Sequence, residues 1–331
     1  ISAKETFSEL YEPNSISNEN KPDYQFNGLF IMTSAQQHFA KNCMRQIPCI
    51  DAAHLGPEVG FTGCLYMAAM QNGDNSPFPI AYAIIPGAES QTSWTFFIKN
   101  IIDIVPFKAF RSDRDKGSLF ALKDLKLKSY ACSKHVFENL RNHKNVGAKN
   151  IKNKDNALNF FITKLCKSST VLEEEHQLNV FLRRFVTDTK KNAVIDYYKS
   201  IHEAITLAYC IRDSDASETI FEPFKPFEPL GVTTTNSVEQ LNNVFLNARK
   251  LPVLDFIKHI NRYEISHFFT KKRDHTNFIK NNPSIKLTKY SRSQIYKMIE
   301  NGKQKYNVIS KSYDDLAGLN IGMISTTQQN N

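Results

Sequence analysis

Three short apolar runs, one amphipathic stretch and a fourth apolar run constrain the fold of this 331-residue chain most strongly. The first three runs are "QIPCIDA", "GFTGCLYMAAMQ" and "PFPIAYAIIPG", each bounded by Gly, Pro or Asn. They predict three successive strands in hairpin connection, with "NGDNSP" as a turn between the second and third. "SQTSWTFFIKNIIDIV" predicts a helix that Ser90 can cap, and "FKAFRS" predicts a fourth strand that ends at Asp113. This order is typical of a mixed α/β sheet.

The rest of the chain is predicted to be largely helical. "GSLFALKDL" and "CSKHVFENLRNH" follow the fourth strand as helices, and residues 150–220 have helical patterns with few strand signals. We interpret that region as a helical insertion in the α/β core. The segment "FEPFKPFEPLG", 221–231, predicts a rigid, extended connector. Two helices follow it, broken before Pro252.

The net charge of +9 is concentrated near the carboxyl end. Residues 271–311 contain eleven Lys or Arg against Asp274 and Glu300, so this segment alone accounts for the whole net charge. A neutral body with one basic segment suits a polyanion, although a solvated tail has the same composition. Interleaved tyrosines favour nucleic acid. The candidates for DNA contact are Lys271, Lys272, Arg273, Lys286, Lys289 and Arg292.

Composition excludes other classes of protein. No apolar run approaches the roughly 20 residues that span a bilayer, and "ISAKETFSEL" lacks the features of a secretory signal. The six cysteines form no C-x-x-C pair and are expected to be reduced and mostly buried. We therefore expect a globular protein with one basic face, and no membrane partner.

Two aspartates fall at matching places on different predicted strands. Asp51 lies on the first strand and Asp113 ends the fourth, an order that resembles the ribonuclease-H-like arrangement, in which carboxylates gather on these strands and on a later helix. Phosphoryl transfer on nucleic acid commonly uses two divalent ions, and Mg²⁺ prefers carboxylate oxygens. Glu239, one turn into a predicted helix, is the candidate for the third acid.

Each acid also has a purely structural interpretation. Asn236 to Glu239 match a capping box, in which the glutamate only bonds the backbone at the helix start. Asp51 could be a strand-end turn former. Asp115 lies past the strand end and is expected to be exposed, which makes it a minor metal candidate. The acids expected to be solvated are Asp103 and Asp124.

Cys132 and His135 form a second candidate site. Residues three apart on a helix share a face, so this pair could supply half of a zinc site. The nearest extra ligand is His143. A buried cysteine beside a hydrogen-bonded histidine is the alternative.

Five segments, in order, resemble the transposases of Mutator-like elements (MULE). They are "FNGLFIMTSAQ", the block from "IPCIDAAHLG" to "SWTFFIKNI", "FRSDRDKGSLFAL", "YACSKHVFENL" and "TTTNSVEQLNNVFLNARKLPVLDFIKHI". Together they span roughly residues 24–262. They resemble the family's first-aspartate block with its E-x-x-x-S-W helix, its second-aspartate block, its C-x-x-H motif and its glutamate block.

The resemblance implies a DDE-type catalytic core in a ribonuclease-H-like fold, a mixed sheet flanked by helices. Asp51, Asp113 and Glu239 would be the catalytic acids and the ligands of Mg²⁺ or Mn²⁺, with Asp115 outside the triad. An all-helical insertion would precede the glutamate. The reaction would be metal-dependent strand cleavage and strand transfer during DNA transposition. Cys132, His135 and Trp94 would have structural or DNA-related roles.

The resemblance also implies partners and a location. The partners would be the element ends and target DNA, bound by a homo-oligomer in the nucleus. The alternative is a domesticated, catalytically silent transposase that regulates transcription by binding DNA; a defunct remnant is a third interpretation.

The expected organisation has five parts: a lead-in segment, 1–45; the first part of the catalytic core, 46–149; the helical insertion and connector, 150–230; the last catalytic helices, 231–270; and the basic segment, 271–331. The chain departs from the family pattern in "DAAH", which replaces D-G-T-H. The family's amino-terminal zinc module and its carboxyl-terminal C-x-C finger do not occur in the sequence, so we expect a catalytic region cut from a longer element.

Overall fold

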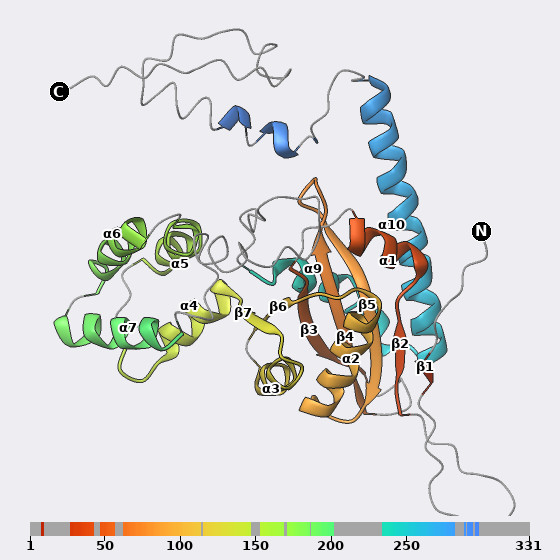
Figure 1. Ribbon diagram of the computed structural model, residues 1–331, viewed down its shortest axis with the longest axis horizontal. Coiled ribbons are helices and arrows are strands. Elements are labelled where there is room, and N and C mark those ends of the chain that lie inside the picture. The colour runs from red at the N-terminus through yellow and green to blue at the C-terminus, as the bar shows by residue number, and fades with distance from the viewer. Residues whose placement is uncertain are drawn as a thin grey trace, which may run out of the picture. The chain divides into compact units, whose positions relative to one another are not determined.

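The computed structural model describes two compact units of the chain (Figure 1). One comprises residues 1–71 and 77–256, and the other comprises 72–76 and 257–331. The described residues are 8–9, 27–42, 47–56, 62–113, 115–146, 153–168, 171–185, 187–201 and 234–281, with 288, 290–293 and 295–297. The extended connector predicted at 221–231 lies outside them.

A seven-stranded mixed sheet, counted over the described residues, forms the centre of the first unit. Its order is β1-β2-β5-β4-β3-β6-β7, and β3, β6 and β7 run parallel while every other neighbouring pair is antiparallel. A mixed sheet of this kind, with helices beside it, is compatible with a ribonuclease-H-like fold. The strands are β1 (Ser8–Glu9), β2 (Leu29–Ile31), β3 (Cys49–His54), β4 (Gly63–Gln71), β5 (Pro77–Pro86), β6 (Ala109–Ser112) and β7 (Lys128–Ala131).

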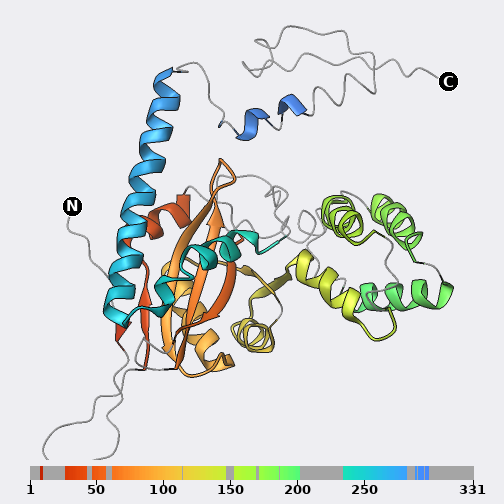
Figure 2. The ribbon, with the colours of Figure 1, turned by 180° about the vertical axis from the view of Figure 1, so that it is seen from behind.

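The central strands are covered on both faces. Eight of the nine residues of β4 are buried, which explains why its sequence is a continuous apolar run rather than an alternating one. On one face, Tyr66 meets Trp94 of α2 (Gln91–Ile104) edge to face, with ring centroids 4.8 Å apart. On the other, Tyr82 meets Phe245, which follows α9 (Asn236–Val244), at 5.8 Å. The two views of the ribbon show α2 and α9 on opposite faces of the sheet (Figure 2).

Helix α2 forms as the sequence predicts. The Ser90 side chain accepts a hydrogen bond from the Ser93 backbone N–H, so it satisfies one of the free donors at the helix start. The residues that face the sheet are spaced three or four apart and are buried: Trp94, Phe97, Ile98 and Ile101. The indole Nε1 of Trp94 donates to Glu89 Oε1 at 2.7 Å, which satisfies its polar edge within the core.

The helices after β7 build a second apolar cluster. Phe137, Phe161 and Phe181 are each at most 1% exposed and pack ring against ring. They come from α4 (Ser133–Asn142), α5 (Lys154–Thr163) and α6 (Val171–Leu182), which are joined by α7 (Asp188–Ile201) and the short helix η3 (Leu165–Lys167). The described part of 150–230 is therefore helical, as predicted.

Several elements differ from the sequence-based expectation. Strand β7 was not predicted, because "KSYA" is too short and too polar to stand out beside the helices on either side of it. In the segment expected as a lead-in, Leu29–Ile31 pair with β5 and α1 (Ser34–Asn42) follows. Helix α10 (Val253–Asn281) runs through the boundary expected at residue 270, after the short helix η5 (Ala248–Lys250). Helix α3 (Lys116–Asp124), by contrast, forms where the sequence predicts a helix.

Among the described residues, none of the helices is both long enough and apolar enough to cross a bilayer.

Candidate active site

Asp51 lies inside β3, not at its end. Its strand neighbour Cys49 is buried, whereas Asp51 is half-buried on the face that α9 covers. The amide Nδ2 of Asn242 on α9 donates to Asp51 Oδ2 at 2.6 Å, and the Ala52 backbone N–H donates to Oδ1 at 3.0 Å. Because the residue sits in a regular strand, the interpretation of Asp51 as a strand-end turn former is wrong.

Asp113 follows the last residue of β6. Cys49 of β3 is the parallel partner of Arg111 of β6, so Asp51 and Asp113 lie two residues further along two adjacent parallel strands. Side chains two residues on point to the same face of a sheet. Asp113 Oδ1 accepts a hydrogen bond from the Asp115 backbone N–H at 3.1 Å. The parallel pairing of β3 and β6 thus brings together two acids that are 62 residues apart in the sequence.

The environment of Asp51 reflects this convergence. Burial is the largest cause that raises the pKa of Asp51, and the charge of Asp113 is the next; the total raises the pKa from 3.8 to about 7. The charge of Glu239 adds a smaller increase, while the hydrogen bonds from Asn242 and Ala52 act in the opposite direction. Both of the other predicted acids, Asp113 and Glu239, therefore lie within electrostatic range of Asp51.

The Glu239 carboxylate bridges α4 and Thr235, the residue that precedes α9. Its Oε2 accepts from Lys134 Nζ at 2.7 Å, and its Oε1 accepts from Thr235 Oγ1 at 3.0 Å. Burial works to raise the pKa of Glu239, but hydrogen bonds from Lys134 and Thr235 outweigh it and lower the pKa. The N-cap of α9 is Thr235, and within the described residues it makes no side-chain capping bond. The capping-box interpretation of Asn236 and Glu239 is therefore wrong.

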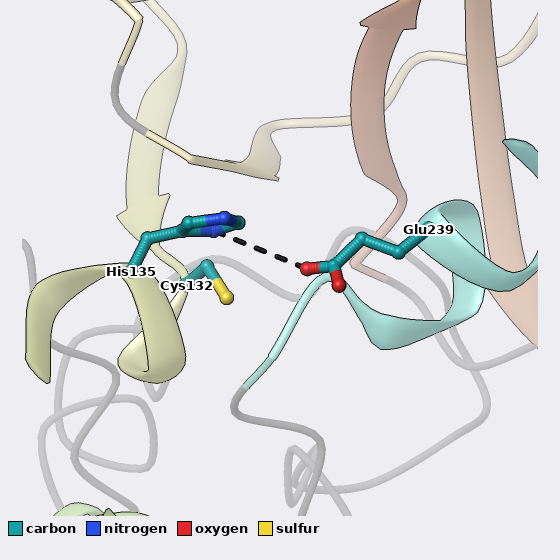
Figure 3. A group of neighbouring side chains, drawn as sticks. All are labelled: Cys132, His135 and Glu239. Atoms are coloured by element: carbon teal, nitrogen blue, oxygen red, sulfur yellow. Dashed lines mark ion pairs between the residues drawn. The ribbon is translucent and has the colours of Figure 1, made fainter. Parts of the chain in front are cut away.

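Cys132 and His135 border Glu239. Cys132 is the buried N-cap residue of α4, and the Thr235 backbone N–H donates to its sulfur at 3.3 Å. Figure 3 shows the side chains of Cys132, His135 and Glu239 directed toward a common space. One ligand atom of each residue lies within 4.8 Å of the other two. His143, predicted as the nearest extra ligand, instead ends α4 and lies beside the ring of Tyr197, with centroids 5.6 Å apart.

Asp115, which was expected to be exposed, is partly buried and has a structural role in the described structure. It is the N-cap of α3, and its Oδ2 accepts from the Gly117 backbone N–H at 2.6 Å. Asp103 and Asp124 are exposed, as expected. Asp124 nevertheless accepts a hydrogen bond from Gln91 Nε2, which links α3 to α2.

Sequence reasoning missed two side chains at this site, Asn242 and Lys134. Asn242 lies three residues after Glu239 and therefore on the same helix face, which is a signal that the sequence does contain. Lys134 is inside the C-x-x-H motif, but its pairing with Glu239 depends on how α4 and α9 meet, and no local pattern encodes that.

The predicted DNA contacts are described only in part. Lys271, Lys272 and Arg273 lie on α10, where Lys271 Nζ donates to Ser76 Oγ at 3.0 Å. Arg292 donates to Tyr296 Oη at 3.0 Å and lies over the same ring. Lys286 and Lys289 are outside the described residues.

Comparison with known proteins leaves the family open. No protein-family model matches the chain, and no curated protein matches it either. Among solved structures, it is similar to the Drosophila P element transposase strand transfer complex, with 10% identity over 69% of this chain and 71% of that chain and a TM-score of 0.26. A similarity at this level carries no argument about activity. The function must therefore be inferred from the residues themselves.

Proposed function

We propose that this chain is the catalytic core of a DDE-type DNA transposase of the Mutator-like type, with Asp51, Asp113 and Glu239 as its catalytic acids. The observation that carries the proposal is the environment of Asp51, whose pKa is raised to about 7 by burial and then by Asp113. Carboxylates that repel one another in a half-buried site are unfavourable for folding and are typical of functional sites. The resemblance of the five sequence segments to the Mutator-like family supplies the reaction.

The side chains fit a divalent cation such as Mg²⁺ or Mn²⁺. Carboxylate oxygens are the ligands that these hard cations prefer, and a cation would relieve the repulsion between Asp51 and Asp113. Those two residues would hold one ion, and Glu239 with one aspartate would hold another. Bound there, the ions would activate the attacking oxygen and stabilise the leaving oxygen of a phosphodiester.

The remaining side chains would orient these ligands. Asn242 fixes one oxygen of Asp51 through its amide and leaves the other directed by the backbone of Ala52. Lys134 neutralises Glu239, so the glutamate can be held near two other acids at a lower electrostatic cost. Together they pre-position the acidic groups before DNA arrives.

The wider proposal follows the sequence resemblance. The fold would be ribonuclease-H-like, with the helices between α4 and α9 as its insertion. The basic segment 271–331 would contact phosphates of the element ends and of target DNA, and the protein would act as a homo-oligomer in the nucleus. The activity would be hydrolytic nicking followed by attack of a 3′-hydroxyl on the target.

Replacement of Asp113 tests this proposal. We expect Asp113→Asn to abolish Mg²⁺-dependent cleavage of supercoiled DNA while DNA binding stays within a factor of two. Asp115→Asn is the matched control, since it neutralises an acid two residues away that caps α3. It should retain cleavage. Equal cleavage by wild type and Asp113→Asn would refute the assignment.

A catalytically silent, DNA-binding regulator is the second candidate. The observation in its favour is the Lys134 ammonium, which lies 2.7 Å from Glu239 Oε2 and competes with any cation for that carboxylate. For a regulator, DNA binding would persist and no variant of Lys134 would restore cleavage. Cleavage by the wild type or by Lys134→Met would favour the enzyme.

A further inference from the structure

We propose that Cys132, His135 and Glu239 form a second metal site, selective for a borderline-soft divalent cation of the Zn²⁺ class and distinct in chemistry from the carboxylate site at Asp51 and Asp113. The sequence offered only the first two of these ligands. The third comes from α9, which lies more than a hundred residues further along the chain.

The geometry of the cluster is close to that of a zinc site. The three ligand atoms lie within 4.8 Å of one another. Zn²⁺ bonds of about 2.0–2.3 Å in a tetrahedron place neighbouring ligands roughly 3.3–3.8 Å apart. Contraction by about 1 Å is therefore needed, and rotation of the Glu239 and His135 side chains, which are 23% and 35% exposed, can supply it.

The backbone favours the anionic form of the sulfur. Cys132 is the N-cap residue of α4, where the positive end of a helix stabilises a thiolate. The Thr235 N–H donates to the same sulfur at 3.3 Å. A thiolate is the form that binds metal.

The donor set distinguishes this site from a magnesium site. Sulfur and imidazole ligands favour Zn²⁺ and related ions, whereas Mg²⁺ prefers oxygen. Three protein ligands leave a fourth position for water or an oxygen of a bound molecule, as in zinc sites that exchange ligands. The exposure of His135 and Glu239 provides access to that position.

The shared glutamate couples the two sites, a consequence that rests on the proposed function. Glu239 cannot direct the same carboxylate oxygen toward Cys132 and His135 and toward Asp51 and Asp113 at once. A zinc-class ion would therefore withdraw Glu239 from the catalytic acids and inhibit the Mg²⁺-dependent reaction.

Titration of the full chain with Co²⁺ tests the metal site without any activity assay. We expect a sulfur-to-cobalt charge-transfer band and the visible bands of a four-coordinate ion, displaced by one equivalent of Zn²⁺. Cys132→Ser should abolish the charge-transfer band, and His135→Gln and Glu239→Gln should weaken Zn²⁺ binding at least tenfold. Circular dichroism verifies that each variant is folded.

Cys64→Ser is the matched control, because Cys64 is another buried thiol beside an imidazole, with its sulfur 3.5 Å from His54 Nδ1. It should retain the band. A wild-type chain without the band, or a band that is lost only in Cys64→Ser, would overturn the inference. Should Cys132→Ser fail to fold, the tenfold loss in His135→Gln and Glu239→Gln decides alone.

A combined variant separates this inference from the proposed function. Asp51→Asn with Asp113→Asn removes the proposed catalytic ligands and should leave Co²⁺ and Zn²⁺ binding unchanged. If the wild type does not cleave DNA but gives a normal cobalt spectrum, the transposase assignment is refuted and the zinc-class site is retained. If the wild type cleaves DNA but gives no cobalt charge-transfer band, the zinc-class site is refuted and the transposase assignment is retained.

Discussion

Asp51 combines a strand position with an electrostatic environment that raises its pKa to about 7. The folded protein binds this proton more tightly than the unfolded chain does. The stabilisation that results is fully present below the unfolded pKa of about 4 and is lost as the pH rises through about 7. At the scale of single residues, ionised Asp51 therefore lowers the unfolding free energy of the metal-free protein at neutral pH.

This cost can be measured. Between pH 5 and pH 8, in the absence of divalent ions, we expect the wild type to lose roughly 2–3 kcal/mol of unfolding free energy from this group. Asp51→Asn keeps an oxygen that can accept from Asn242 and should lack that loss. Urea denaturation of both proteins at the two pH values measures the difference. An identical pH dependence in the two proteins would contradict the assignment of the raised pKa.

At the scale of helices and strands, the contact between α2 and α3 depends on a small residue, Gly117. A Cβ at Gly117 would lie 3.0 Å from Trp94 Cδ1, 3.0 Å from Asp115 Oδ2 and 3.1 Å from the Ser90 carbonyl carbon. The indole cannot yield easily because Trp94 is buried in the packed core, and the Ser90 carbon belongs to the backbone at the start of α2. Gly117 therefore permits the close approach of the two helices beside Asp113.

Gly117→Ala should destabilise the protein by about 1–2 kcal/mol. Overpacking costs about 1–3 kcal/mol, and the better helix propensity of alanine offsets up to about 1 kcal/mol of that cost. Lys116→Ala, at an exposed neighbouring position of the same helix, is the control and should change stability by less than about 0.5 kcal/mol. If the two variants have equal midpoints of urea denaturation, the close contact of Gly117 with α2 is absent.

The elements of the core were largely predictable from the sequence because their patterns are local. The apolar runs, the turn "NGDNSP" and the Ser90 cap each specify an element without reference to the rest of the chain. The pairing of Lys134 with Glu239 and the position of Asp51 inside β3 were not predictable, since both depend on how distant elements pack. The expected capping box at Asn236 fails for the same reason: Glu239 finds a stronger partner on α4.

At the scale of the whole molecule, the net charge equals that of residues 271–311, which lie within the basic segment. Residues 271–311 carry the equivalent of the total net charge of +9, and the described part of the segment places Lys272 and Arg273 on exposed positions of α10. Binding of DNA through this segment would be dominated by phosphate contacts and therefore by the release of counterions.

Neutralisation of two of these side chains tests that role. The slope of log K against log[salt] changes by about 0.9 for each phosphate that the protein neutralises, so Lys272→Gln with Arg273→Gln should reduce its magnitude by nearly 2. Lys99→Gln with Lys123→Gln removes the same charge from exposed positions on α2 and α3 and should change the slope by less than half as much. Fluorescence anisotropy between roughly 50 and 200 mM salt measures the slope for each variant. If the two pairs of substitutions change the slope equally, DNA binding depends on net charge alone and not on the position of these side chains.

The binding of Mn²⁺ tests the central claim, that acids from β3, the end of β6 and α9 form one site for hard divalent cations. Electron paramagnetic resonance reports free Mn²⁺ directly during a titration of the full chain. We expect saturable binding that Asp51→Asn and Asp113→Asn each weaken at least tenfold, that Glu239→Gln weakens to a smaller extent, and that Asp103→Asn leaves unchanged. Binding of equal strength in the wild type, Asp51→Asn and Asp113→Asn would contradict the account.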